Sequence, residues 1–186
     1  MPTRIPYPDL ATKSARVNEI VGQAPINVSR MMANASEGVV AGFIALGSSF
    51  YQGTDLPADL REIGILRAGY VAKSDYETWQ HESIARSVGI TDAQIDAIKA
   101  GKAPAGVMNA AQEAVLAFTD ELVVNGTPSD AALAEVRKHL PDDQMLDLVL
   151  VTGFYMMVSR FLNTTGVERD TDRGPIDAKF INKATA

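Results

Sequence analysis

The sequence predicts an all-α protein. Apolar residues recur at helical spacing along most of the chain, and no segment shows the sustained alternation of apolar and polar residues that is typical of a half-buried strand. Prolines lie where one helical segment gives way to the next. A chain of 186 residues is long enough to bury a real core within one domain. We therefore expect about eight helices packed as one domain over residues 1–186.

The first third of the chain begins with an extended lead-in, because three prolines fall within its first eight residues. Helical spacing of apolar residues then predicts a helix from Asp9 to Gly22. A short helix is expected from about Asn27. The segment from Val39 to Tyr51 is apolar almost all round, which predicts a buried helix that ends at Gly53.

The middle of the chain predicts three consecutive helices, within a region of about residues 57–99. Pro57 suits a first helical position and opens a helix to about Lys73. The next helix begins near Ser74 and ends before Gly89. Thr91 and Gln94 have the spacing of a capping box, which predicts the start of the third helix.

The last third of the chain follows a break around Pro104. Helices are expected over residues 110–124, from about 127 to 136, and over 144–165 with Gly166 as the end of the last one. Residues 168–186 are polar and include Gly174 and Pro175, so we expect a C-terminal tail.

Composition excludes several classes of function. The formal net charge of −6, without a local cluster of Lys or Arg, argues against a nucleic-acid partner. The absence of cysteine removes disulfides, thiolate nucleophiles and Cys-containing metal sites. The N-terminus has no apolar run typical of a signal peptide, and the apolar stretches Val39–Leu46 and Leu146–Val158 are shorter than the ~20 residues that span a bilayer. We expect a cytoplasmic protein without a membrane partner.

The best candidates for chemistry are Glu77 and His81. They lie four residues apart, so their side chains share one helical face. A carboxylate beside an imidazole raises the imidazole pKa and orients the ring, as general acid–base chemistry requires. The other interpretation is an exposed pair that stabilises the helix by a few tenths of a kcal/mol. His139, the second histidine, follows Arg137 and Lys138 and is expected to be a solvated residue near a helix C-terminus.

The segment from Leu60 to Ile95 resembles the signature of the carboxymuconolactone decarboxylase family, which includes the alkyl hydroperoxidase D-like proteins. Two further segments, Phe118–Leu122 and Gly153–Val167, resemble the second half of such proteins. The signature residues in this chain are Arg61, Glu62, Leu66, Arg67, His81, Ala85, Gly89, Ile90, Thr91 and Ile95. The resemblance implies an alkyl hydroperoxidase D-like helical bundle that assembles as a homo-oligomer, a trimer or a hexamer. The apolar helices at 39–51 and 146–162 agree with an oligomer, because they carry more apolar surface than one monomer needs to cover.

One departure from the family pattern limits the chemistry. Peroxidase-type members carry a C-x-x-C pair, and those two positions are Ser74 and Glu77 here, whereas Glu62 and His81 match the positions of the proton relay. Without a thiolate, peroxidase chemistry is excluded. The chain is more similar to the decarboxylase-type members, which carry a Glu-x-x-x-His of the same spacing.

The resemblance therefore implies a cofactor-free lyase or decarboxylase acting on a small carboxylated or lactone metabolite. His81 would carry the proton, Glu77 would orient it and Glu62 would extend the relay. Hydrolysis or hydration at the same pair is a close variant. The alternative from another class is a non-catalytic protein that binds a small molecule or serves as an accessory, which would lack a closed, partly apolar pocket around His81.

Substrate-binding candidates follow from hydrogen-bonding and charge. Ser74, Tyr76 and Tyr155 are possible hydrogen-bond partners of a ligand, although Ser74 also suits a helix N-cap. Arg67 or Arg160 would clamp a small anionic substrate, since a guanidinium binds a carboxylate through two hydrogen bonds. Each arginine has a structural alternative: Arg67 as a partner of Glu62 or Asp59, and Arg160 in an ion pair between helices. A metal site is not expected, because the chain has only two histidines and no cysteine.

Overall fold

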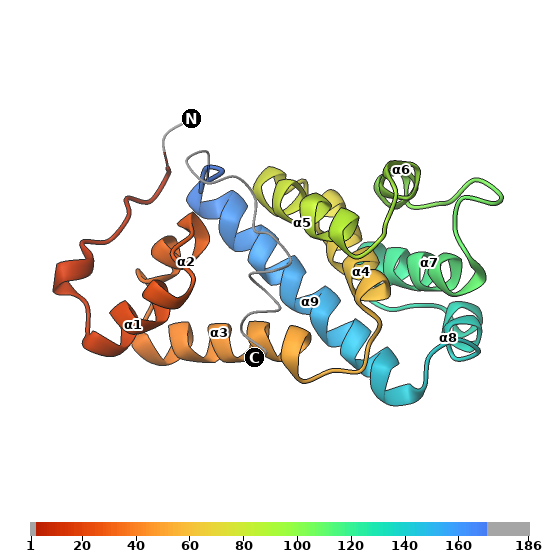
Figure 1. Cartoon of the computed structure of the whole chain (residues 1–186), viewed down its shortest axis with the longest axis horizontal. Coiled ribbons are helices and arrows are strands. Elements are labelled where there is room, and N and C mark those ends of the chain that lie inside the picture. The colour runs from red at the N-terminus through yellow and green to blue at the C-terminus, as the bar shows by residue number, and fades with distance from the viewer. Residues whose placement is uncertain (1–2, 171–186) are drawn as a thin grey trace.

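The computed structural model describes residues 3–170 and is all-α, with no strand within that range. A short 3-10 turn and nine α-helices follow one another along the chain (Figure 1). They are η1 (Leu10–Thr12), α1 (Ala15–Gln23), α2 (Asn27–Met32), α3 (Glu37–Gln52), α4 (Ala58–Val71), α5 (Asp75–Ser87), α6 (Asp92–Ala100), α7 (Ala110–Asn125), α8 (Asp130–Val136) and α9 (Asp142–Thr165). The predicted fold class is thus confirmed.

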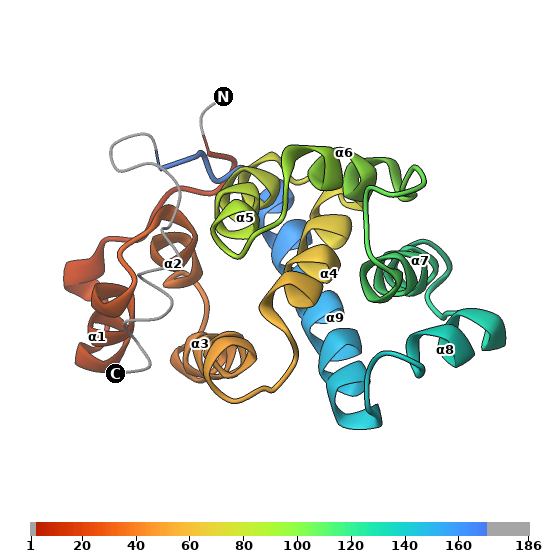
Figure 2. The same ribbon diagram turned by 45° about the vertical axis from the view of Figure 1, so that its right-hand side comes forward.

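The helices are arranged around α9, which runs through the middle of the molecule. Helices α1 to α3 lie on one side of it, and α6 to α8 lie on the other (Figure 1). Turning the molecule shows α4 and α5 between these two groups (Figure 2). Helix α4 packs against α5, α7 and α9, and every residue from Leu60 to Leu66 is buried. Burial on all sides explains why α4 lacks a distinct polar face.

A glycine sets the close approach of α4 to α9. A Cβ atom added at Gly64 would lie 2.9 Å from both Leu148 Cδ1 and Thr152 Oγ1 of α9, which is closer than real Cβ contacts. Only a residue without a side chain therefore allows these two helices to pack at this distance.

The predicted boundaries are close to the observed ones, because local hydrogen bonds define them. Thr91 and Gln94 form the predicted capping box at the start of α6. Gly166 ends α9 in the left-handed conformation. The predicted helix from Asp9 to Gly22 is instead divided: Asp9 caps the 3-10 turn, and Ser14 accepts a hydrogen bond from the backbone N–H of Val17 and so starts α1.

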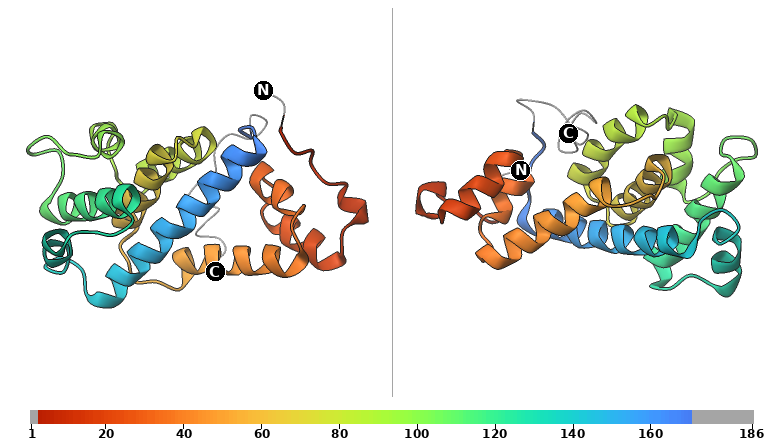
Figure 3. Two further views of the ribbon diagram at one scale, coloured as in Figure 1. Left: turned by 180° about the vertical axis from the view of Figure 1, so that it is seen from behind. Right: turned by 60° about the horizontal axis from the view of Figure 1, so that its bottom comes forward.

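Helix α3 corrects the expectation of a buried helix. Only Val40 and Phe50 of α3 are buried, whereas Val39 and Leu46 are 56% and 47% exposed. The buried side faces α9, where Phe50 contacts Phe154. The view from behind in Figure 3 shows α9 running past α3. The chain alone therefore leaves an apolar side of α3 uncovered.

Helix α9 is the longest helix of the described part of the chain. By length and composition it could cross a membrane, with a mean hydropathy of 1.5, although its apolar stretches taken singly are short. Half of the most apolar 18-residue stretch of α9 is buried inside the protein. This burial is typical of the core helix of a globular domain.

The expected C-terminal tail begins as a packed segment. Asp170 is 2% exposed, and Arg169 forms an ion pair with Asp75 of α5. The rest of the expected tail lies outside the described residues.

Candidate active site

Three residues predicted from the sequence meet inside the protein. Glu77 and His81 lie one turn apart on α5, and His81 Nε2 is 3.0 Å from Glu77 Oε1. Glu62 comes from the neighbouring helix α4, where its Oε2 atom lies 2.7 Å from His81 Nδ1. All three side chains are buried, and Glu62 is fully buried. The imidazole is therefore held between two carboxylates from two helices.

A fourth charge extends this row. Arg61 is 7% exposed, and its Nε atom donates to Glu62 Oε1 at 3.3 Å. Its Nη1 atom donates to the backbone carbonyl of Phe50 at 3.3 Å. Buried charges are stable only when they are paired and hydrogen-bonded. Arg61, Glu62, His81 and Glu77 satisfy this condition by alternating in sign, so that the row is neutral when His81 is protonated.

The row fixes the protonation state of His81. Burial lowers the pKa of His81, but Glu62 and then Glu77 outweigh this effect and raise it from 6.5 to about 9. At neutral pH the ring is therefore an imidazolium, and both of its nitrogens donate hydrogen bonds. The buried His81 side chain can therefore donate a proton at neutral pH.

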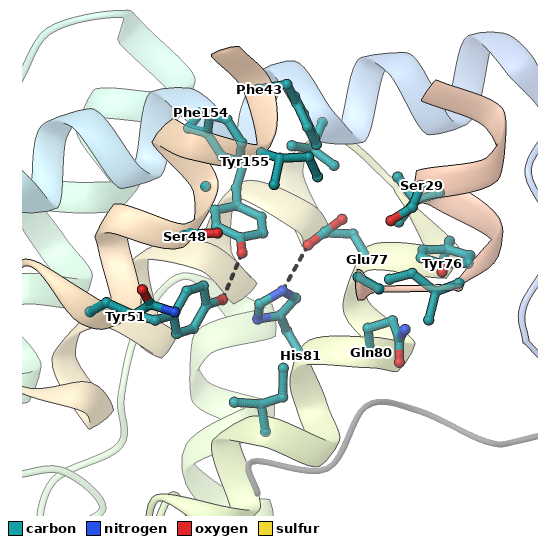
Figure 4. A pocket seen from close by; sticks show the side chains of 18 residues that line it. Ser29, Phe43, Ser48, Tyr51, Tyr76, Glu77, Gln80, His81, Phe154 and Tyr155 are labelled. Carbon is teal, nitrogen blue, oxygen red and sulfur yellow. Dashed lines mark hydrogen bonds and ion pairs between the residues drawn. The ribbon is translucent and has the colours of Figure 1, made fainter. Parts of the chain in front are cut away.

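The row ends at a cavity of about 220 Å³, lined by residues of α2, α3, α5 and α9 (Figure 4). His81 and Glu77 both line it, whereas Glu62 and Arg61 lie behind them. Its walls are mostly apolar and include Ile26, Val28, Phe43, Ile84, Phe154 and Val158. An apolar enclosure strengthens the electrostatic effect of each charge inside it.

Two tyrosines form a second polar feature of the cavity. The hydroxyl oxygens of Tyr51 on α3 and Tyr155 on α9 lie 2.6 Å apart, and both side chains line the cavity (Figure 4). The ring of Tyr155 packs edge-on against His81, with 4.8 Å between the centroids. The guanidinium of Arg61 lies 4.4 Å from the centroid of the Tyr51 ring. The tyrosine pair and the charged row therefore meet at one end of the cavity.

Comparison with known proteins agrees with this architecture. Residues 38–121, which include α4, α5 and most of the site, match the model of the carboxymuconolactone decarboxylase family. This segment is thus similar to proteins of the carboxymuconolactone decarboxylase family. No curated protein matches the chain.

Solved structures share the fold at low identity. The alkylhydroperoxidase AhpD core protein from Ralstonia eutropha JMP134, an uncharacterised peroxidase-related protein, is 20% identical with a TM-score of 0.75, and covers 100% of this chain and 98% of its own. The debrominase Bmp8, solved with 2,3,4-tribromopyrrole, is 12% identical with a TM-score of 0.73, covering 100% and 96%. An uncharacterised peroxidase-related protein from Silicibacter sp. TM1040 is 17% identical with a TM-score of 0.70, covering 92% and 93%. These similarities show an AhpD-like fold.

Within the family segment, Glu77 and Ser74 occupy the two positions of the cysteine pair, and the structure separates them. Glu77 faces the cavity. Ser74 lies away from it, in a polar hollow with Lys73, Trp79 and Arg169. Ser74 is the N-cap residue of α5, but its side chain makes no capping hydrogen bond. Of the two positions, only Glu77 belongs to the cavity.

The two arginines expected to clamp an anionic substrate do not reach the cavity. Arg67 pairs with Asp120 at 2.6 Å and donates to the carbonyls of Ile98 and Lys99, so it joins α4, α6 and α7. Its partner is thus Asp120, 53 residues away, rather than Glu62 or Asp59. Arg160 is exposed on α9 and does not line the cavity.

Tyr76 lines the cavity, as predicted for a substrate-binding residue, but its hydroxyl group is already in use. It donates to Asp170 Oδ2 at 2.6 Å. The other oxygen of Asp170 accepts the backbone N–H of Asn27 at 2.8 Å, at the first residue of α2. Asp170 therefore connects two walls of the cavity. A capping acid far away in sequence explains how α2, whose own N-cap Ile26 has no side-chain acceptor, begins at Asn27.

Two residues of the site, Arg61 and Tyr51, were not predicted from the sequence. The Arg61-Glu62 dipeptide was a usable signal, because adjacent opposite charges within an otherwise apolar helix are unusual unless they are paired. Tyr51 gave no such signal, since a tyrosine in an apolar helix is most simply a core residue. Among the described residues, no group of three or more His, Cys, Asp or Glu side chains is arranged to hold a metal ion. His139, the second histidine, lies outside the site, 3.8 Å from Glu135.

Proposed function

We propose that this protein is an acid–base enzyme of the lyase or isomerase type, acting on a small lactone or other carbonyl-bearing metabolite. The observation that supports the proposal most directly is the hydrogen-bonded row Glu62–His81–Glu77, which ends at the wall of an apolar cavity. An ion pair that served stability alone would need no cavity beside it. A titratable pair with a shifted pKa inside a cavity is typical of an active site.

The geometry divides the roles between Glu77 and His81. His81 is protonated at neutral pH, so it acts as the acid. The Glu77 carboxylate lies beside it in the cavity wall and acts as the base, within hydrogen-bond reach of the imidazolium that returns the proton. Glu62 and Arg61 position His81 and balance its charge from behind. Glu62 therefore shares the orientation of the imidazole with Glu77, since each carboxylate is bonded to one ring nitrogen.

The reaction needs no co-reactant if the substrate contains a carbonyl group. In an isomerisation, Glu77 removes a proton from the carbon next to the carbonyl, and the electron pair of the C–H bond moves toward the carbonyl oxygen. The proton then returns to the same delocalised system at another carbon. In a decarboxylation, the C–C bond to the carboxylate breaks, carbon dioxide leaves, and the His81 imidazolium protonates the carbon and then regains a proton from solvent.

The cavity size and the structural similarities are consistent with a small ring compound. A cavity of about 220 Å³ is somewhat larger than the ~150 Å³ that encloses benzene. Bmp8, which has the same fold, was solved with 2,3,4-tribromopyrrole, a five-membered ring. We take a molecule with one ring and a few substituents as the expected substrate size.

The test is turnover by wild type and by three variants. Ultraviolet spectra and carbon dioxide release are followed over a panel of muconolactones, uncharged lactones and β-keto acids. Glu77→Gln and His81→Gln are expected to lower kcat at least ~100-fold on any compound that wild type converts. The matched control is Glu82→Gln, which alters the same helix at a carboxylate bonded to Tyr70 and Arg86 outside the cavity.

The results separate the enzyme from a non-catalytic binding protein. Loss of turnover in Glu77→Gln and His81→Gln, with melting temperatures near that of Glu82→Gln, supports catalysis at this row. Saturable binding of a panel compound by wild type without turnover of any compound contradicts it and favours the binding protein.

A further inference from the structure

We infer that the Tyr51–Tyr155 hydroxyl pair is a hydrogen-bond subsite for the carbonyl oxygen of an uncharged substrate. This inference rests on the proposed function, because it names the substrate class that the cavity takes. It assigns a role to two side chains from α3 and α9 that approach each other at the charged row. Among the lactone and carboxylated metabolites considered above, it selects the uncharged ones.

The hydrogen count of the pair supplies the first argument. The two phenol groups carry two hydrogens, but a single hydrogen lies between oxygens that are 2.6 Å apart. The described part of the chain gives neither hydroxyl another hydrogen-bond partner. One O–H group therefore remains available where both tyrosines line the cavity. An acceptor atom of a ligand would accept the hydrogen bond of this O–H group.

The surroundings keep both hydroxyls in the donor form. Burial, Tyr155 and Glu62 raise the pKa of Tyr51 well above 10, and burial together with Glu77 does the same for Tyr155. The cation of Arg61, 4.4 Å from the Tyr51 ring centroid, offsets part of this effect. A protonated phenol that is hydrogen-bonded to a second phenol can donate to a substrate oxygen that gains negative charge. Both hydroxyl groups then stabilise this charge.

The position of the pair fits the proton transfer. Tyr155 packs edge-on against His81, and His81 is bonded to Glu77. A carbonyl oxygen held at the tyrosine pair would place the neighbouring carbon toward the Glu77 carboxylate. When that carbon loses its proton to Glu77, the charge develops on the oxygen next to the hydroxyl pair. When the proton returns to the substrate, the negative charge on the oxygen disappears and Glu77 is again a carboxylate.

The charges around the cavity argue for an uncharged ligand. Among the described residues that line it, the charged ones are Glu77 and His81, which are paired with each other, and none is Lys or Arg. A carboxylate entering this cavity would lose its hydration beside Glu77 and find no free cation. A ketone or lactone avoids this cost and still accepts a hydrogen bond.

The experiment measures binding, so that it does not depend on turnover. The probes are acetophenone as an uncharged ring ketone, benzoate as a carboxylate of similar size, and toluene as a ring without an acceptor. Affinities are measured by calorimetry, and the carbonyl stretch of bound acetophenone is measured by infrared difference spectroscopy. The variants are Tyr51→Phe and Tyr155→Phe, which each remove one oxygen. Tyr70→Phe is the matched control, because Tyr70 lies outside this cavity and donates to Glu82.

Wild type is expected to bind acetophenone more tightly than benzoate or toluene and to shift its carbonyl stretch to lower frequency. Tyr155→Phe and Tyr51→Phe are expected to weaken acetophenone binding about tenfold and to reduce the shift, as the loss of one hydrogen bond predicts. Tyr70→Phe should leave the shift unchanged. Tighter binding of benzoate, the absence of acetophenone binding, or an unchanged shift in both variants would overturn the inference.

The two proposals fail separately. If wild type binds acetophenone through the tyrosines but converts no compound, the subsite is supported and the proposed catalysis is contradicted. If turnover depends on Glu77 but not on Tyr51 or Tyr155, the catalysis is supported and the subsite is contradicted. Circular dichroism of each variant shows whether a lost effect reflects a lost fold.

Discussion

His81 Nδ1 on α5 lies 2.7 Å from Glu62 Oε2 on α4, so the imidazole is bonded to a carboxylate that is 19 residues earlier in the chain. Both side chains are almost completely buried. This single contact ties the two helices of the family segment together through charge. It also sets the protonation state of the residue that faces the cavity.

Removing the charge of Glu62 should lower the pKa of His81. Glu62→Gln keeps the shape of the side chain but removes the largest of the effects that raise the pKa to about 9, while burial still lowers it. We expect the pKa to fall toward or below 6.5. The measurement is a pH titration of the His81 ring signals by NMR, with His139 as the internal reference. A His81 pKa that stays near 9 would show that Glu62 does not control it.

The shift of His81 also predicts how stability depends on pH. The folded pKa is raised above the unfolded value, so the contribution of His81 is fully present below pH 6.5 and is lost as the pH rises through about 9. The loss should be on the order of a few kcal/mol, because each unit of pKa shift corresponds to about 1.4 kcal/mol. Urea unfolding from pH 6 to 10 measures it. His81→Gln should show a flatter profile over this range, and identical profiles would contradict the prediction.

The close approach of α4 and α9 predicts a cost for a single methyl group. Gly64→Ala places a Cβ atom 2.9 Å from Leu148 Cδ1 and Thr152 Oγ1, so these side chains or the two helices must shift. We expect a loss of about 1–3 kcal/mol in the free energy of unfolding. The control is Gly22→Ala in α1, where an added Cβ meets no atom within 4 Å. It should be neutral or slightly stabilising, since Ala favours a helix over Gly. Equal stability of the two variants would show that α4 and α9 tolerate separation.

The uncovered apolar face predicts self-association, and we propose a homo-oligomer, a trimer or a hexamer. Val39 and Leu46 of α3 and Leu146, Leu150 and Met157 of α9 are each about half exposed or more. On α9, Leu150 follows Leu146 by four residues and Met157 follows Leu150 by seven. This spacing places the three side chains along one side of the helix. Exposed apolar residues gathered on two helices are typical of a contact surface.

A charged residue on this face should dissociate the oligomer into monomers. Leu150→Glu and Leu46→Glu are expected to give the mass of the 19.9 kDa monomer by light scattering, whereas wild type gives a multiple of it. Val124→Glu is the matched control, because Val124 is 59% exposed on α7, away from this face. Monomeric wild type at micromolar concentration would contradict the proposal.

The helices could be predicted from the sequence because their signals are local. Periodicity, capping residues and stop glycines lie within each helix or beside it, and Thr91 with Gln94 shows this directly. Glu77 and His81 were predictable for the same reason, since four residues fix their relative position on α5. Glu62 lies on another helix, and only the resemblance to the family connected it to His81.

The remaining site residues depend on contacts that no local pattern encodes. Tyr51 and Tyr155 are 104 residues apart, and each resembles a core aromatic in its own helix. Arg67 looks suited to a substrate, yet its partner Asp120 arrives from α7. Asp170 belongs to a polar segment, and its burial depends on Tyr76 and Asn27 lying next to each other. Tertiary packing, rather than propensity, decides these positions.

The contacts of Asp170 have a consequence for the order in which the protein matures. Asp170 follows all nine helices of the described residues 3–170, yet it holds the N-terminus of α2 and the hydroxyl of Tyr76. Domains are synthesised from the N-terminus, so α2 and α5 leave the ribosome well before their shared anchor. The two walls therefore gain their fixed separation only when translation has passed residue 170. A nascent chain that has already folded α4 and α5 still lacks the contacts that join these two walls until Asp170 has emerged and packed.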